Sequence, residues 1–149
     1  MPTLRAATPA DYERLVGVVD AWWGRPIAGS LPRLFLDHFH RTSLVAEDGG
    51  ELAGFLVGFV SPSEPAHAYI HFVGVAPGNR STGLGRRLYE RFFEIARDAG
   101  CTRVGAITAS VNAASIAFHT RLGFNVKGPI DGYDGPGSRM MVFDRALET

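Results

Sequence analysis

A strand, a glycine-containing loop and an amphipathic helix follow one another between residues 66 and 100 of this chain. Residue alternation predicts a strand over Ala66–Val75, and the loop Ala76–Thr82 follows it. From Leu84 onward the apolar positions 84, 88, 92, 95 and 99 lie on one face of a helix that Gly100 ends. The first turn of such a helix carries unpaired N–H groups and the positive end of the helix dipole. The segment therefore predicts an α/β fold with an anion-binding loop.

Two common phosphate-binding motifs are not completed by this loop. Gly78 and Gly83 have the outer spacing of a nucleotide P-loop, but Leu84 and Gly85 stand where that motif needs lysine and then serine or threonine. Gly83-Leu84-Gly85 begins like a dinucleotide fingerprint, but Leu88 occupies the place of its third glycine. An anion site of another kind and a plain strand-to-helix turn both stay open at this point.

The remaining periodicities place this segment in a mixed sheet. They predict a helix between Thr8 and Gly24, further helices over Leu31–His40 and Asn112–Arg121, and strands over Thr3–Ala6, Ser43–Glu47, Leu52–Val60, Thr102–Thr108, Asn125–Ile130 and Arg139–Phe143. The turn at Asp48-Gly49-Gly50 predicts a hairpin, and the strands before and after the Leu84 helix predict a parallel pair. We expect a single α/β domain over residues 1–149, with a mixed, largely antiparallel sheet flanked by helices.

Composition limits the function classes. The 149 residues are 46% hydrophobic and carry a net charge of +0, which suits one globular domain and gives no global field for nucleic acid or an anionic membrane. A single cysteine, Cys101, excludes a disulfide framework and a multi-cysteine zinc site, and no other metal-ligand cluster is evident. The longest apolar run, Leu52–Val60, is too short to span a membrane, and residues 1–5 show no secretory signal. We expect a cytoplasmic protein.

Two motifs carry a resemblance to a known family. Arg-x-x-Gly-x-Gly at residues 80–85, after Val75-Ala76-Pro77, resembles the acetyl-CoA pyrophosphate loop of the GCN5-related N-acetyltransferase (GNAT) superfamily. Asn-x-x-Ser at residues 112–115, followed by Leu-Gly-Phe at 122–124, resembles the second signature of that family, especially its phosphinothricin-acetyltransferase-like members. The expected order of elements matches the family fold from Leu4 to Phe143, which is nearly the whole chain.

The resemblance implies how acetyl-CoA would be bound. Its pyrophosphate would be held at the loop and the helix start, at Arg80, Ser81, Thr82, Gly83, Leu84, Gly85 and Arg86. The strand edge at Val73 and Val75 would pair with the pantetheine arm, Asn112 would form a hydrogen bond with that arm, and Ser115 would assist in binding the cofactor. Many members have glycine at the position of Ser81, so the backbone has less freedom here.

The catalytic residues follow less directly. His119 occupies the position of the tyrosine that in many members protonates the departing thiolate, whereas Tyr69 stands where the histone-acetylating members have a carboxylate base. His71 is the first candidate for a base, because a neutral imidazole accepts a proton near neutral pH. Tyr69 and His67 share its predicted face and are weaker candidates. The alternative for His71, Tyr69 and His67 is packing or hydrogen bonding in a half-buried sheet, and the alternative for His119 is a histidine on the helix surface.

Three aromatic residues are candidates for the acceptor pocket, because family members place their first two helices and the last loop beside the acceptor. They are Trp23, Phe39 and Tyr133. Trp22 and Trp23 are adjacent on a predicted helix and point in different directions, so at least one of them belongs to the core.

The expected function is an acetyl-CoA-dependent N-acetyltransferase that moves an acetyl group to the primary amine of a small molecule by direct attack on the thioester. The alternative is a non-catalytic acetyl-CoA-binding sensor or regulatory module, motivated by Ser81 and the missing strand carboxylate. Nucleic-acid binding through the arginines between Arg80 and Arg91 is disfavoured by the neutral net charge and the lack of interleaved aromatic residues. The resemblance also implies a homodimer as one expected assembly, although the sequence carries no interface signal.

Overall fold

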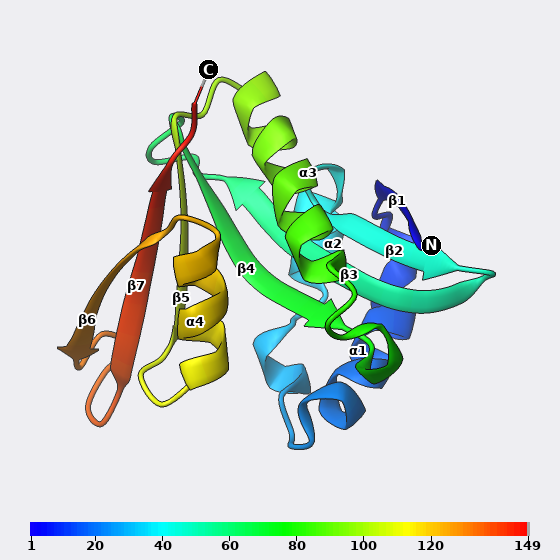
Figure 1. The fold of residues 1–149 in the computed structure, drawn as a ribbon, viewed down its shortest axis with the longest axis horizontal. Helices are drawn as coiled ribbons and strands as arrows, with labels where there is room; N and C mark the ends of the chain where they lie inside the picture. Colours follow the sequence, from blue (N-terminus) through cyan, green and yellow to red (C-terminus); the bar gives the residue numbers. More distant parts are fainter. Residues whose placement is uncertain (149) are drawn as a thin grey trace. The chain divides into compact units, whose positions relative to one another are not determined.

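The computed structural model describes residues 1–148, and its strands and helices follow one another in the predicted order (Figure 1). The strands are β1 (Thr3–Ala6), β2 (Leu44–Asp48), β3 (Glu51–Val60), β4 (His67–Val75), β5 (Arg103–Ala109), β6 (Asn125–Asp131) and β7 (Arg139–Ala146). The helices are α1 (Tyr12–Trp23), α2 (Leu34–Phe39), α3 (Leu84–Asp98) and α4 (Ala113–Arg121), with short 3-10 turns η1 (Pro9–Asp11), η2 (Ala28–Ser30), η3 (His40–Thr42) and η4 (Pro77–Asn79). None of the helices in residues 1–148 is both long and apolar enough to cross a membrane.

The strands form a mixed sheet with the hydrogen-bonded order β1-β2-β3-β4-β5-β7-β6. The pairs β1–β2, β2–β3, β5–β7 and β6–β7 are antiparallel. β4 and β5 pair in parallel, with His67 opposite Arg103. The parallel pair is the one predicted across the Leu84 helix, because a parallel partner needs a crossover connection of this length. The expected fold class, an α/β fold with a largely antiparallel sheet flanked by helices, is confirmed.

The chain forms two compact units, one from Met1–Phe59 with Ile70–Ile95 and one from Val60–Tyr69 with the chain from Ala96 onward. In the first unit, Leu15 and Val19 of α1 and Leu36 of α2 are buried with Phe55 of β3 and Phe72 of β4. The expectation of a single domain stays a prediction.

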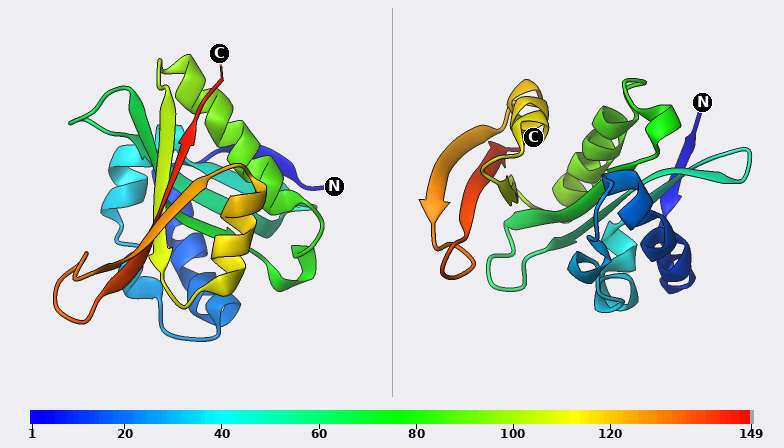
Figure 2. Two further views of the ribbon diagram at one scale, coloured as in Figure 1. Left: turned by 60° about the vertical axis from the view of Figure 1, so that its left-hand side comes forward. Right: turned by 90° about the horizontal axis from the view of Figure 1, so that it is seen from below.

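Helix α3 packs on the other face of the strands in the first unit. A Cβ atom added at Gly54 would lie 3.2 Å from a methyl carbon of Leu84 and 2.9 Å from the Gly74 carbonyl oxygen. Successive residues of a strand point to opposite faces, so Gly54 faces α3 while its neighbour Phe55 faces α1 and α2. Figure 2 shows the same two-sided arrangement, with the blue helices and the green helix on opposite sides of these strands.

The second predicted helix is shorter than expected. The sequence predicts a helix over Leu31–His40, whereas α2 begins at Leu34 and ends at Phe39. Leu31 precedes Pro32 and has φ −124° and ψ 72°, which is outside the helical region. A residue before proline is pushed away from helical angles by the proline ring, so the helix cannot begin at Leu31.

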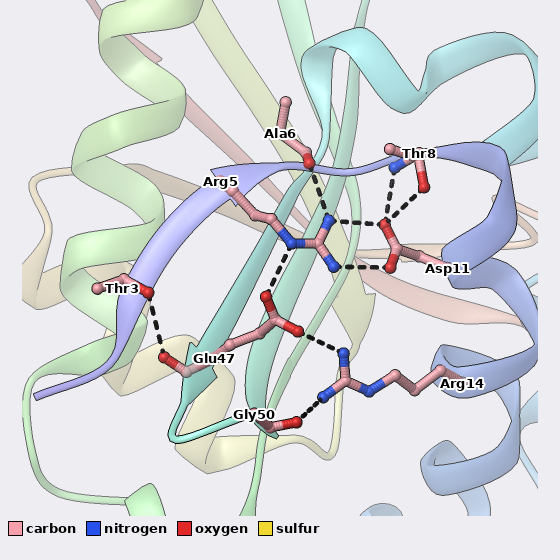
Figure 3. A network of polar contacts seen from close by, with 8 residues as sticks. All are labelled: Thr3, Arg5, Ala6, Thr8, Asp11, Arg14, Glu47 and Gly50. Atoms are coloured by element: carbon pink, nitrogen blue, oxygen red, sulfur yellow. Dashed lines mark hydrogen bonds and ion pairs between the residues drawn. The ribbon is translucent and has the colours of Figure 1, made fainter.

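An ion-pair network joins β1, β2 and α1 (Figure 3). The Arg5 guanidinium donates to both carboxylate oxygens of Asp11, at 2.9 and 2.8 Å, and its Nε donates to Glu47 at 2.8 Å. The backbone N–H of Thr8 also donates to Asp11, at 2.8 Å. These bonds, above all the one from Arg5, lower the pKa of Asp11 from 3.8 to about 2. The network therefore stabilises the ionised carboxylate in the folded state.

Substituting Asp11 by asparagine is expected to lower the free energy of unfolding at neutral pH by about 2 kcal/mol. The native pKa lies below the unfolded value, so this stabilisation is full above about pH 4 and is lost as the pH falls toward about 2. Denaturant unfolding of both proteins at several pH values measures the difference. The exposed Asp98 provides a matched Asp98→Asn control, for which we expect almost no change. An equal loss at acidic and neutral pH would contradict the assignment.

Candidate functional site

The loop between β4 and α3 presents a row of backbone N–H groups. Ser81 has φ 64° and Gly83 has φ 86°, and a Cβ atom added at Gly83 would meet no other atom within 4 Å. The first backbone bond of α3 runs from the Arg87 N–H to the Gly83 carbonyl at 3.1 Å, so the N–H groups of residues 84–86 precede the helical ladder. This geometry has room and donors for an anion such as a pyrophosphate.

The backbone at Ser81 is left-handed, a conformation that glycine adopts more readily than serine. A non-glycine residue at such a φ is uncommon, since its Cβ atom approaches the backbone too closely. Strain of this kind persists where the surrounding structure holds the loop, often at a functional site. Ser81 therefore holds this backbone conformation at a cost that glycine would avoid.

The arginines of the loop are not equivalent. Arg80 donates to the Trp22 carbonyl at the end of α1, at 2.6 Å. Arg87 donates to the Pro2 carbonyl at 2.9 Å. Arg86 is exposed and has no partner among residues 1–148. Of the two arginines predicted to bind the pyrophosphate, Arg86 thus has a free guanidinium, and Arg80 joins the loop to α1. The side chain of Leu84 is buried, so its backbone N–H is the donor that this residue could offer to a ligand.

His71 lies in the first unit, on the same strand as Val73 and Val75. Its Nε2 lies 2.7 Å from the Ser30 carbonyl oxygen, and its ring stacks on Phe35 with 3.9 Å between centroids and 4° between planes. Partial burial lowers the pKa of His71 below 6.5, against a smaller opposing effect of the Ser30 hydrogen bond. The imidazole is therefore neutral at neutral pH and able to accept a proton, as the sequence predicts.

Two of the predicted acceptor residues also lie in the first unit. Phe39 contacts Phe35 at 5.9 Å and Phe59 at 4.8 Å between ring centroids. The ring centroids of Trp23 and Phe72 lie 4.9 Å apart. Trp23 is partly buried and packs against the hydrophobic core of this unit. The acceptor roles of Phe39 and Trp23 stay predictions. Phe35 was not predicted, although its spacing of four residues from Phe39 on a helix is the signal that places the two rings side by side.

The second signature lies in the second unit, where Asn112 caps α4. Its side-chain oxygen accepts from the Ser115 N–H at 3.1 Å, so its amide NH2 is the group left for a ligand. His119 Nδ1 lies 2.7 Å from the Ser115 carbonyl oxygen and 3.3 Å from the Ser115 hydroxyl. The cofactor roles of Asn112 and Ser115 stay predictions.

His119 belongs to an aromatic cluster. It is 5% exposed and stacks on Phe143 with 4.0 Å between centroids and 7° between planes. Its ring also meets the edges of Phe118 and Phe124. Burial lowers the pKa of His119, so the imidazolium form that donates a proton most readily is scarce at neutral pH. The alternative expected for His119, a histidine on the helix surface, is wrong because the side chain is buried, and the acid role of His119 stays a prediction.

Tyr69 lies in the second unit, together with Tyr133 of the loop between β6 and β7. Burial raises the pKa of the Tyr69 hydroxyl far above its usual value, and the neighbouring Tyr133 and Asp134 add to the shift. Tyr69 therefore stays protonated at neutral pH, which suits a hydrogen-bond donor better than the base considered for it. Tyr133 is 47% exposed and within reach of solutes.

Residues 1–148 contain no group of three or more His, Cys, Asp or Glu side chains that could hold a metal ion.

The model of the acetyltransferase (GNAT) family matches residues 8–124, and these include the whole loop at α3 and the second signature through Phe124. The chain belongs to the GNAT family. This assignment confirms the resemblance on which the site was predicted, and it leaves the role of each site residue as a prediction.

Relatives of this GNAT chain act on amino acids, by their names. L-2,4-diaminobutyric acid acetyltransferase of Virgibacillus pantothenticus is 34% identical over 82 residues, which are 55% of this chain and 52% of that protein. L-methionine sulfoximine/L-methionine sulfone acetyltransferase of Pseudomonas aeruginosa is 32% identical over 126 residues, which are 80% of this chain and 73% of that protein. This GNAT chain spans about half the length of the diaminobutyrate acetyltransferases that it matches.

Solved structures share the fold. Diaminobutyrate acetyltransferase from Paenibacillus lautus, solved with L-2,4-diaminobutyric acid and coenzyme A, has a TM-score of 0.72 to this GNAT chain at 19% identity. The match covers 96% of this chain and 94% of that chain. It supports the fold and says nothing of individual side chains in this protein.

Proposed function

We propose that this chain is an acetyl-CoA-dependent N-acetyltransferase whose acceptor is the primary amine of a small amino acid. The observation that carries the proposal is the open row of N–H groups at the start of α3, with left-handed backbone at Ser81 and Gly83, in a chain of the GNAT family. Backbone amides of residues 81–86 and the free Arg86 guanidinium would hold the pyrophosphate. The edge of β4 at Val73 and Val75 and the amide of Asn112 would bind the pantetheine arm.

Acetyl transfer requires a deprotonated amine, a polarised acetyl carbonyl and a proton for the departing sulfur. Acetyl-CoA supplies the activated acetyl group: the C–N bond forms, the nitrogen gives up its second proton to solvent, the thioester C–S bond breaks, and the sulfur leaves and takes up a proton. The acceptor must first lose a proton, because an ammonium has no lone pair. A neutral His71 takes that proton, directly or through a water. The N–H of Val73 or Val75 polarises the acetyl carbonyl, and His119 stays the proposed source of the proton for the sulfur.

The surroundings of His71 favour an acceptor with an uncharged side chain. Phe35, Phe39 and Phe59 form a half-buried row of rings on one side of the imidazole, and no charged side chain contributes to its lowered pKa. A second ammonium group would lose hydration against these rings without a carboxylate to replace it. We therefore propose an acceptor closer to methionine sulfone or methionine sulfoximine than to diaminobutyrate.

Release of free thiol from acetyl-CoA tests this function. The panel comprises L-methionine sulfone, L-methionine sulfoximine, L-2,4-diaminobutyrate, a polyamine and a short peptide, and mass spectrometry identifies each acetylated product. We expect the highest kcat/KM with the two methionine derivatives. Binding of acetyl-CoA without turnover on any amine would favour the non-catalytic sensor instead. A preference for diaminobutyrate would keep the activity but contradict the proposed acceptor class.

We further propose a cytoplasmic enzyme whose partners are small molecules rather than nucleic acid or membrane. The net charge of +0 is the support, since it gives no field for polyanions. A homodimer is the assembly proposed from the family resemblance, and light scattering of the purified protein measures it.

A further inference from the structure

We propose that Phe35, together with the Ser30 carbonyl, is a positioning element that fixes His71 as a base with its lone pair on Nδ1. The inference rests on the proposed function and adds the residues that orient the base. Phe35 lies on α2 and Ser30 in the turn η2, so both belong to the segment that precedes β2 within the first unit. Neither residue was marked by a sequence motif.

The hydrogen bond decides which nitrogen carries the proton. The Ser30 carbonyl oxygen can only accept, so the nitrogen 2.7 Å from it, Nε2, must donate. A neutral imidazole has one N–H, and the lone pair is then on Nδ1. Among residues 1–148 no partner is found for Nδ1, which leaves it available to an ammonium or a water.

The stack with Phe35 holds the plane of the His71 imidazole, which the single hydrogen bond to Ser30 does not. A single bond at Nε2 allows the imidazole to swing about it, whereas a flat partner at 3.9 Å and 4° holds the plane of the ring. The tilted ring of Phe72, with its centroid 6.1 Å away, limits movement from another direction. Two contacts of different kinds therefore fix the direction of the Nδ1 lone pair. A base must be held in this way to contribute fully to proton transfer.

No charged group competes for the imidazole in this unit. The turn η2 has no titratable side chain. On α2, Asp37 and His38 are exposed, and neither contributes to the pKa of His71. Arg33, just before α2, is ion-paired with Glu13. On β4 itself, His67 and Tyr69 do not contribute to that pKa either. The protonation of His71 therefore follows from its burial, which Phe35 helps to provide.

Nuclear magnetic resonance tests the arrangement without an acceptor. Correlation of the ring nitrogens of His71 with its carbon-bound protons distinguishes the two neutral forms. We expect the form with hydrogen on Nε2 in the wild-type protein. In Phe35→Leu we expect a mixture of the two forms, because a ring whose plane is no longer held keeps the Ser30 hydrogen bond only part of the time. The opposite form in the wild type, or an unchanged signal in the variant, would overturn the proposal. This result stands whether or not the protein transfers acetyl groups.

Kinetics with the best acceptor provide the second test. Phe35→Leu is expected to lower kcat by about 10- to 100-fold with an unchanged KM for acetyl-CoA. The acid limb of the pH profile of Phe35→Leu should move to higher pH, because the imidazole of His71 becomes more exposed and its pKa rises. Phe35→Tyr keeps a flat ring and should restore kcat, and Leu34→Ala, at an exposed position of the same helix, should resemble the wild type.

A Phe35→Leu enzyme no slower than Leu34→Ala overturns the inference. A wild type inactive on every amine overturns the proposed function instead, while the spectra still decide the positioning.

Discussion

Replacement of His71 by alanine is expected to lower kcat by roughly 10²- to 10⁴-fold, the usual contribution of a positioned base. The neutral imidazole accepts the proton of the ammonium, and burial keeps the pKa of His71 below 6.5. Activity of the wild type should therefore fall as the pH drops through a midpoint below that value, since protonated His71 cannot act as a base. The variant should lack this acid limb. The measurement is kcat/KM against pH for both enzymes with the best acceptor.

Two further variants make the test of His71 specific. His71→Gln keeps a donor for the Ser30 carbonyl and should fold as the wild type does, yet it should be as slow as the alanine variant. His38 is an exposed histidine of α2, and His38→Ala should retain wild-type kcat and the wild-type pH profile. Unchanged turnover in both His71 variants would show that the amine loses its proton without this residue. Tyr69 would not then take its place as a base, because its raised pKa keeps it protonated.

The fold was predictable because, along most of the chain, the local sequence pattern and the tertiary packing favour the same helices, strands and turns. Gly49 and Gly50 have φ 59° and 84°, as the predicted tight hairpin turn requires. Along β4 half-buried and buried residues alternate without a break from His67 to Val75, so the periodicity in the sequence predicted the faces correctly. The parallel pair β4–β5 followed from the length of its connection. At Pro32 the expectation was wrong, because the proline ring disfavours helical angles at Leu31 despite the apolar spacing around it.

The chemistry of the site was less predictable, because it depends on contacts between distant residues. No motif indicates the contact of the Arg80 guanidinium, which donates to the Trp22 carbonyl, 58 positions away in the sequence. His119 lies in a signature motif, and only the structure shows its ring stacked on Phe143 and buried. The bond between His71 and Ser30 joins residues 41 positions apart. A motif specifies a residue type and a backbone position, whereas the protonation state and orientation of that residue depend on its tertiary neighbours.

Substitution of Gly83 by glutamate is expected to abolish acetyl-CoA binding at concentrations that saturate the wild type. The new carboxylate would lie beside the N–H groups at the start of α3, where it would accept their hydrogen bonds and repel a pyrophosphate. Charge-assisted hydrogen bonds contribute about 1.5–3 kcal/mol each, so losing two of them weakens binding by on the order of 100-fold or more. Isothermal titration calorimetry with acetyl-CoA measures the loss.

The strain of the substitution must be separated from its charge, because Gly83 has φ 86° and any L residue is disfavoured there. Gly50 provides the control: its φ is 84°, and an added Cβ atom likewise meets nothing within 4 Å. Gly50→Glu should therefore lose a similar amount of stability and keep its affinity for acetyl-CoA. Gly83→Ala should bind more tightly than Gly83→Glu, because it has the strain without the carboxylate. If Gly83→Glu binds as well as Gly50→Glu, the pyrophosphate is not held at this helix end. The cofactor roles of residues 80–86 would then be wrong, although the assignment of His71 as the base would stand on its own test.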